Sequence, residues 1–217
     1  MNLNDYTQMV YVVGKRTPQG VSMLGTGFLV SSQGHIATTH HVIDSDPQSL
    51  VILVPHTTSV NGYQSLSDHS CQPVPVEVEE IDPVHDLAIV KAAFTFTAPL
   101  PDLGSFDDVL VGQQVGIFGF PHCVEGRRAL TFQKAEIGAK VAMENNGIEV
   151  KHAVINSQAR PGQSGSVVFS LEKRSICGVL VGAWAPSKSG ISLGGINPRE
   201  LHQTTHCVSA EYIRSML

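Results

Sequence analysis

The sequence contains little charge and no block of basic residues. Only 15% of its 217 residues are Asp, Glu, Lys or Arg, and the formal net charge is −5 at pH 7. Surfaces that bind nucleic acid or anionic membranes generally need clustered Lys and Arg, so neither partner is expected. A low charge content also favours short, mostly buried strands over long solvated helices.

The sequence also has no long apolar run and no closely spaced cysteines. Residues 1–15 do not combine a basic start with an apolar core, so no secretory signal is predicted. No stretch approaches the roughly 20 apolar residues that cross a bilayer as a helix. Cys71, Cys123, Cys177 and Cys207 lie far apart, so two disulfides could form, but reduced thiols are favoured. We therefore predict a cytoplasmic protein without a cofactor.

Short apolar or alternating segments separated by turn residues are abundant. Val, Ile, Phe and Thr dominate these segments, and the 20 Gly and 12 Pro lie mostly between them. The segments span residues 8–14, 25–31, 35–39, 49–54, 74–81, 87–92, 113–120, 128–138, 148–157, 166–170, 176–185 and 206–209. About a dozen short strands at this spacing predict an all-β, antiparallel sandwich or pair of barrels.

The connecting segments predict one domain made of two halves. Residues 94–106 include two prolines and show little periodicity, so they are expected to link an N-terminal half (about 7–93) to a C-terminal half (about 107–208). Residues 54–73 have the composition of a long surface loop. Apolar positions after Ser209 predict a short C-terminal helix over about 209–217, with Ser209 as its N-cap.

The stretch ARPGQSGSVVF (159–169) holds a serine between two glycines ahead of an apolar run. Such clusters are usually turns, and a serine hydroxyl is a weak nucleophile without a neighbouring base and an acid that orients it. Gly162 can adopt the positive φ that turns its own N–H and that of Ser164 towards one point. The loop therefore offers a nucleophile and an oxyanion hole if a base and an acid lie elsewhere.

Two other segments offer that base and that acid. GHIATTHHVID (34–44) carries His40 and His41 behind an apolar strand, although lone histidines are usually surface or core residues. Asp86 lies at the mouth of the apolar run LAIV, where a carboxylate needs a partner. The order of His41, Asp86 and Ser164 differs from the Ser, acid, His order of α/β-hydrolases, which also need strand–helix alternation.

Three blocks of the sequence resemble the catalytic blocks of trypsin-like serine proteases. They are GTGFLVSSQGHIATTHHVI (25–43), DPVHDLAIVK (82–91) and PGQSGS (161–166), and they are most similar to the HtrA-type branch. The resemblance spans about residues 8–215 and includes no PDZ domain. It implies two perpendicular six-stranded antiparallel β-barrels with the active site in the cleft between them.

Carried over by position, the resemblance implies a serine endopeptidase that forms an acyl-enzyme intermediate. His41, which directly precedes Val-Ile, is the expected general base in preference to His40. Asp86 would orient its imidazole, and Ser164 would attack the scissile carbonyl with the N–H groups of Gly162 and Ser164 as oxyanion hole. Gln163 stands where the family has Asp or Asn, which excludes an ion pair to a freed N-terminus.

Position in the family also indicates the segments that bind substrate. The expected lining is residues 156–160, 181–185 and 187–193, and Glu172, the only acid from 150 to 199, lies outside it. A pocket for Arg or Lys is therefore disfavoured, because it needs a buried counter-charge. The predicted substrate-binding residues are Gln158, Ala159, Arg160, Gly182 and Trp184.

Three alternatives stand beside an active peptidase that acts on protein or peptide substrates. The chain could be a catalytically silent trypsin-fold module that binds protein, or the protease module of a larger multidomain effector. Further domains or a regulatory partner protein would then be involved. A metal-binding protein using His122-Cys123 or His206-Cys207 is least favoured, because adjacent residues on a strand point to opposite faces.

Overall fold

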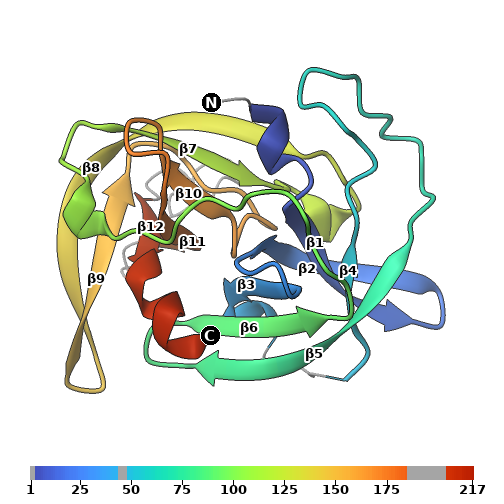
Figure 1. Cartoon of the computed structure of the whole chain (residues 1–217), viewed down its shortest axis with the longest axis horizontal. Coiled ribbons are helices and arrows are strands. Elements are labelled where there is room, and N and C mark those ends of the chain that lie inside the picture. The colour runs from blue at the N-terminus through green and yellow to red at the C-terminus, as the bar shows by residue number, and fades with distance from the viewer. Residues whose placement is uncertain (1–2, 44–47, 185–203) are drawn as a thin grey trace, which may run out of the picture.

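The computed structural model describes residues 3–43, 48–184 and 204–217, which form two closed antiparallel barrels (Figure 1). The first barrel has the strand order β1-β2-β3-β6-β5-β4 and the second has the order β10-β11-β12-β9-β8-β7. The strands are β1 Val10–Thr17, β2 Gly20–Leu29, β3 His35–Thr39, β4 Leu50–Leu53, β5 Pro73–Asp82, β6 Leu87–Ala92, β7 Gln114–Gly119, β8 Thr131–Asn145, β9 Ile148–Ile155, β10 Val167–Ser170, β11 Ile176–Trp184 and β12 Thr204–Ser209. The predicted all-β fold with two six-stranded barrels is confirmed, and each predicted segment overlaps one strand.

The helices of the described residues are short. They are η1 Leu3–Tyr6, α1 His40–Ile43, η2 Phe106–Asp108, η3 Cys123–Glu125 and η4 Ala210–Met216. The helix η4 follows Ser209 as expected, but the Ser209 hydroxyl does not cap it; this hydroxyl accepts the Phe106 N–H at 3.2 Å. No helix in the described part of the chain is long and apolar enough to cross a membrane.

The two ends of the chain help to tie the barrels together. Tyr6 of η1 precedes the first barrel, yet its ring stacks on two rings of the second barrel. The ring centroids are 4.5 Å apart for Phe169 of β10 and 5.6 Å apart for Phe118 of β7. Tyr212 of η4 follows the second barrel, and its ring stacks on His85 of the β5–β6 turn at 3.8 Å. Each aromatic pair contributes about 0.5–1.5 kcal/mol beyond its buried area, so both ends resist separation of the barrels.

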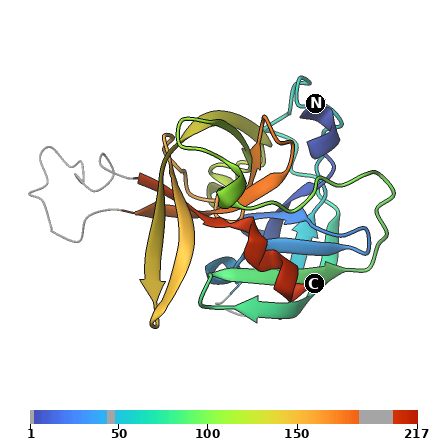
Figure 2. The same cartoon turned by 60° about the vertical axis from the view of Figure 1, so that its left-hand side comes forward.

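The β8–β9 hairpin is longer than the predicted strand over 128–138. Figure 2 shows it extending beyond the second barrel alongside the first. Its outermost residues, 142–145 on β8, are all exposed, so no face is buried there and local hydrophobicity does not predict this part as a strand. The Asn145 side chain at its tip donates to the Val84 carbonyl at 2.7 Å, in the turn that carries Asp86. The hairpin therefore braces the turn on the opposite barrel.

The cysteines give a test of this core. All four are free; Cys71 is exposed, and Cys123, Cys177 and Cys207 are buried. Burial raises the pKa of the Cys123 and Cys177 thiols to about 12 and that of Cys207 well above its usual range. Iodoacetamide at about pH 8 should therefore modify only Cys71 in the folded chain, and all four thiols after unfolding. Two or more adducts on the folded chain, counted by intact mass, would contradict this arrangement.

Candidate active site

His41 and Asp86 form a close pair between α1 and the β5–β6 turn. His41 Nδ1 lies 2.7 Å from Asp86 Oδ2, and the His41 backbone N–H donates to Asp86 Oδ1 at 3.0 Å. The His40 N–H donates to the Asp86 carbonyl at 3.1 Å. Because the carboxylate accepts from Nδ1, the ring nitrogen Nε2 is left as a proton acceptor. The pair thus has the geometry of a base held by an acid.

This pair is too exposed to be explained by stability. The His41 side chain is 48% exposed and that of Asp86 is 28% exposed, and surface ion pairs contribute at most about 1 kcal/mol. Asp86 has a φ of +53°, in the left-handed region that Asp and Asn adopt more readily than most residues. One carboxylate holds both the ring and the backbone N–H of His41 at an exposed position, which indicates a candidate functional site.

Residues 159–166, which we call the Ser164 loop, and the helix α1 both pack against Gly25. A Cβ built on Gly25 would lie 2.7 Å from Val42 Cγ2, beside His41, and 3.0 Å from the Ser164 carbonyl oxygen. The Ser164 hydroxyl itself donates to the Val181 carbonyl at 2.9 Å. Within the described residues, no hydrogen bond joins this hydroxyl to His41. The structure therefore places His41 in contact with Asp86, whereas the Ser164 hydroxyl is hydrogen-bonded to a carbonyl of strand β11.

The backbone of the loop directs two N–H groups away from the protein's own carbonyls. The carbonyls of Pro161 and Gln163 accept from His122 N at 2.6 Å and from Ser166 N at 2.9 Å. Each trans peptide points its N–H opposite its carbonyl, so these bonds orient the N–H groups of Gly162 and Ser164. In the described part of the chain, neither N–H donates to a backbone carbonyl. Two such donors are what a developing oxyanion requires.

Two residues of the loop adopt conformations that favour glycine. Gly162 has a φ of +88° and Gly165 a φ of +84°. A Cβ on Gly165 would lie 1.9 Å from the Thr26 carbonyl oxygen, so no side chain fits there. The prediction of a positive φ at Gly162 is confirmed. Gly165, however, is required by its close approach to β2 rather than by space beside the serine.

Gln163 stabilises the loop from inside the second barrel. Its side chain is fully buried; Nε2 donates to Gln133 Oε1 at 2.5 Å and Oε1 accepts the Arg160 N–H at 2.8 Å. A neutral amide satisfies both partners without the desolvation cost of a buried charge. The position that the family fills with Asp or Asn here holds a hydrogen-bonded amide.

The predicted substrate-binding residues fall into three groups. Gly182 lies beside the Ser164 hydroxyl, since a Cβ on it would be 4.0 Å from Ser164 Oγ. Ala159 is buried, with its N–H donating to Thr205 Oγ1 at 2.8 Å, whereas Gln158 and Arg160 are exposed. Trp184 ends β11, but its side chain lies outside the described part of the structure, as do residues 185 and 187–193.

Sequence reasoning missed Thr205 and Thr26. Thr205 on β12 also donates to the Ser157 carbonyl at 2.5 Å, so its hydroxyl fixes the segment before the Ser164 loop. Thr26 on β2 contacts the loop directly. Thr26 lies in the block GTGF, where a polar residue within an apolar strand is the signal that could have singled it out. No local pattern marks Thr205.

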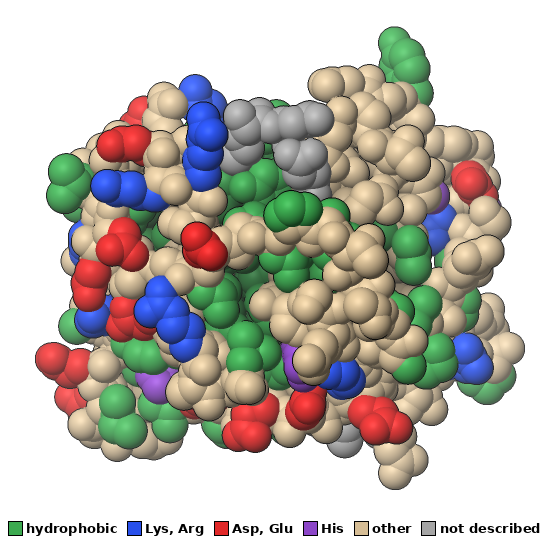
Figure 3. Space-filling view, in the orientation of Figure 1, with side chains coloured by type: hydrophobic (Ala, Val, Ile, Leu, Met, Phe, Trp, Pro, Cys, Tyr) green, Lys and Arg blue, Asp and Glu red, His purple; other side chains and the backbone are tan. Residues whose placement is uncertain are grey.

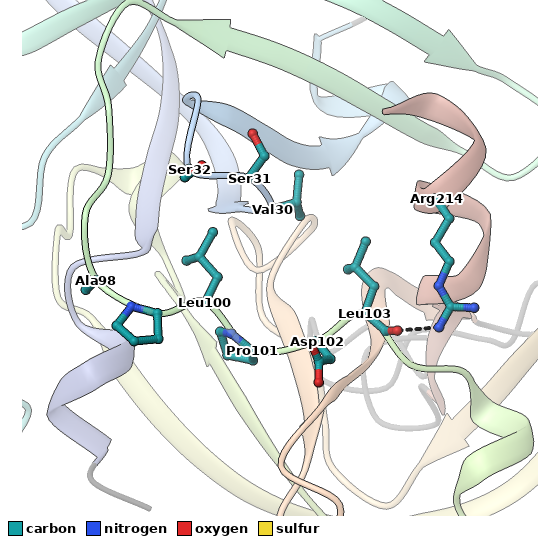
Figure 4. A pocket seen from close by; sticks show the side chains of 10 residues that line it. Val30, Ser31, Ser32, Ala98, Leu100, Pro101, Asp102, Leu103 and Arg214 are labelled. Carbon is teal, nitrogen blue, oxygen red and sulfur yellow. Dashed lines mark hydrogen bonds between the residues drawn. The ribbon is translucent and has the colours of Figure 1, made fainter.

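A separate hollow of about 820 Å³ lies beside the segment that links the barrels (Figure 4). It is lined by Val30, Ser31, Ser32, Ala98, Pro99, Leu100, Pro101, Asp102, Leu103 and Arg214. The Arg214 side chain donates to the Leu103 carbonyl, and hydrophobic side chains gather towards the middle of this face (Figures 3 and 4). None of the candidate catalytic residues lines this hollow.

The pairs His122-Cys123 and His206-Cys207 do not join larger metal-binding groups. Among residues 3–43, 48–184 and 204–217, no three His, Cys, Asp or Glu side chains are arranged to hold a metal ion. Cys123 Sγ instead lies 3.7 Å from the Gly162 carbonyl and 3.8 Å from the Gly25 carbonyl. The Cys123 side chain therefore fills space behind the Ser164 loop.

Comparison with known proteins agrees with this geometry. The family model of the trypsin-like peptidase domain matches residues 25–179. A probable periplasmic serine endoprotease DegP-like from Pseudomonas putida is 27% identical over 166 residues, which cover 72% of this chain and 30% of the relative. The uncharacterized protein y4bJ from Sinorhizobium fredii is 28% identical over 150 residues, which cover 66% of this chain and 20% of the relative. The chain thus spans less than a third of each of these relatives.

Solved structures share the fold at low identity. The MamO protease domain from Magnetospirillum magneticum superposes with a TM-score of 0.70 at 18% identity, covering 98% of this chain and 97% of that one. The Rv3671c protease of M. tuberculosis, in its active form, gives 0.66 at 20% identity, covering 99% and 82%. The name of the P. putida relative includes the word periplasmic, which does not support the predicted cytoplasmic location.

Proposed function

Because the chain belongs to the family of trypsin-like peptidase domains, we propose that it is a serine endopeptidase with Ser164 as nucleophile, His41 as general base and Asp86 as its orienting acid. The observation that carries the proposal is the contact of 2.7 Å between His41 Nδ1 and Asp86 Oδ2. Beside it lies a serine loop in which two N–H groups donate to no backbone carbonyl of the described residues. A base held by an acid and two N–H donors beside a serine are together the parts that acyl transfer requires.

The reaction follows from this arrangement. The Ser164 hydroxyl turns from the Val181 carbonyl to His41 Nε2, which takes its proton as Oγ bonds to the scissile carbonyl carbon. The N–H groups of Gly162 and Ser164 stabilise the oxyanion, and Asp86 stabilises the protonated imidazole. Collapse breaks the C–N bond and His41 returns the proton to the leaving amine. Water then hydrolyses the acyl-enzyme by the same steps.

Protein or peptide chains are the substrates that the family implies. In this proposal the substrate lies along Gln158, Ala159 and Arg160 on one side and Gly182 and Trp184 on the other. The sequence has no acid in these segments to neutralise a buried Arg or Lys, which disfavours cleavage after basic residues. Since the chain spans 20–30% of the curated relatives described above, it also fits the protease module of a larger protein with further domains.

A catalytically silent protein-binding module is the second candidate. One observation favours it: the Ser164 hydroxyl donates to the Val181 carbonyl at 2.9 Å, so a rotation must precede attack. An enzyme can make that rotation, because exchanging one hydrogen bond of the hydroxyl for another has a small net free energy of about 1 kcal/mol. A silent module does not bring the hydroxyl and the imidazole together productively.

Labelling with a fluorescent alkyl fluorophosphonate separates the two candidates. An activated serine forms a bond to phosphorus and expels fluoride, whereas an ordinary serine does not react. We expect the folded chain to gain one adduct, mapped by peptide mass spectrometry to Ser164, and the heat-denatured chain to gain none. A chain that unfolds cooperatively but takes no label would contradict the enzyme and support the silent module.

A further inference from the structure

We infer that Thr26 is a positioning residue for the oxyanion hole, although it lies on the other barrel. This inference rests on the proposed function, because it concerns the same two N–H groups. Thr26 is on β2, is fully buried, and is separated from Gly162 by 136 positions. It does not touch the reacting atoms; it acts through the backbone of the Ser164 loop.

The backbone N–H and the hydroxyl of Thr26 each donate a hydrogen bond to a carbonyl of the Ser164 loop. Its backbone N–H donates to the Ser164 carbonyl at 2.8 Å, and its hydroxyl donates to the Gly162 carbonyl at 2.9 Å. The same hydroxyl accepts the Phe120 N–H at 3.1 Å. Its donor and one acceptor position are thus both occupied, which fixes the direction of the O–H bond.

These contacts fix the orientation of the Gly162–Gln163 and Ser164–Gly165 peptide groups, which lie next to the peptides that carry the oxyanion donors. With the Gly162 carbonyl on the Thr26 hydroxyl, the opposite N–H of Gln163 donates to the Arg160 carbonyl at 3.1 Å. With the Ser164 carbonyl on Thr26 N, the N–H of Gly165 donates to the Leu180 carbonyl at 2.8 Å. The Ser164 N–H belongs to the peptide between these two fixed groups, and the Gly162 N–H belongs to the peptide just before the first of them. The directions of both donors are therefore restrained by their neighbours.

Thr26 is itself held firmly enough to act as a reference point. The Thr38 hydroxyl on β3 donates to the Thr26 carbonyl at 2.7 Å. A Cβ on Gly165 would overlap that carbonyl, so the loop lies directly against β2. The Phe120 contact joins the segment after β7 to the same hydroxyl. One hydroxyl therefore links three segments from two barrels around the anion site.

The hydroxyl can be removed while the Thr26 backbone contact stays. Valine has nearly the shape of threonine, so Thr26→Val keeps the N–H that binds Ser164 and leaves the Gly162 carbonyl and the Phe120 N–H without this partner. Thr26→Ser restores the hydroxyl. Thr39→Val is the matched control: Thr39 is fully buried on β3, and its hydroxyl has no partner in the described part of the chain.

The experiment measures fluorophosphonate labelling of the full chain, with the rate at saturation separated from the half-saturating probe concentration. Removing one oxyanion donor outright costs about 100- to 1,000-fold, so a loosened donor in Thr26→Val should lower the saturating rate by roughly 10- to 100-fold. The half-saturating concentration should change by less than about 3-fold, because probe binding does not use the anion hole. Thr26→Ser and Thr39→Val should stay close to wild type.

A purely structural role predicts a different pattern. It would lower the unfolding temperature without changing the saturating rate of the molecules that remain folded. Wild-type rates in folded Thr26→Val, or equal losses in the serine and valine variants, would overturn the inference. If Thr26→Val does not fold, Thr26→Ala against Thr26→Ser isolates the hydroxyl, and equal rates overturn it likewise. An unlabelled wild type would instead overturn the proposed function, and this inference with it.

Discussion

Replacing Ser164 or His41 with alanine is expected to lower kcat for peptide hydrolysis on the order of 10⁶-fold, because each removal disables the whole nucleophile–base unit. The losses should not add, and the double variant should be no slower than either single one. The residual rate over water would come from the oxyanion hole and from substrate binding, which both variants keep. Initial rates on a casein substrate, with active-site labelling to count competent molecules, provide the measurement.

His40 is the control for His41 because it is its neighbour on α1. The contact of His40 with Asp86 runs through the backbone N–H at 3.1 Å, which alanine keeps. We expect His40→Ala to stay within about 3-fold of the wild-type rate, as is usual for substitutions outside the reacting groups. A large loss of activity in His40→Ala together with a small loss in His41→Ala would contradict the assignment of His41 as the base.

Asp86→Asn is expected to lower kcat by about 10⁴-fold while the fold is retained. The Asn carbonyl can still accept from the His41 backbone N–H, but its NH₂ group would then face Nδ1. The imidazole would have to carry its proton on Nε2, where it can no longer accept one from Ser164. Asn tolerates the φ of +53° at this position better than most residues, so backbone strain should not add to the effect.

Asp82→Asn tests whether any aspartate–histidine pair in this turn would behave alike. Asp82 lies four residues before Asp86, and its Oδ2 is 2.5 Å from His85 Nδ1. We expect its activity within about 3-fold of wild type, since neither residue reaches the serine loop. Thermal unfolding of both variants is measured in parallel. A 10⁴-fold loss shared by Asp82→Asn and Asp86→Asn would show that the turn, and not the tautomer, governs the rate.

The position of Ser164 adds a kinetic consequence to both predictions. Its hydroxyl donates to the Val181 carbonyl at 2.9 Å, and the next residue of strand β11, Gly182, lies beside the same hydroxyl. The hydrogen bond to Val181 must be exchanged for one to His41 before attack, and such an exchange has a small net free energy of about 1 kcal/mol. Rotamer exchange is also fast, so it does not limit a typical kcat.

Local sequence patterns alone predict the strands and the candidate site residues. Alternating and apolar segments mark each of the twelve strands, because burial on one face imposes a period of two. The order of His41, Asp86 and Ser164 within three motifs predicts them as the candidate catalytic residues. Each of these signals is local: it lies within about ten neighbouring residues, where propensity, turn chemistry and motif are read.

The contacts that hold those residues in place are visible only in the folded structure. The Thr26 hydroxyl on the Gly162 carbonyl, the buried Gln163–Gln133 amide pair and the Asn145 contact to Val84 each join segments 30 or more positions apart. The same is true of the outer β8–β9 hairpin, whose exposed charged residues carry no apolar pattern. Single hydrogen bonds between distant segments leave no period in the sequence, because any residue with the right donor can supply them once folding has brought the segments together.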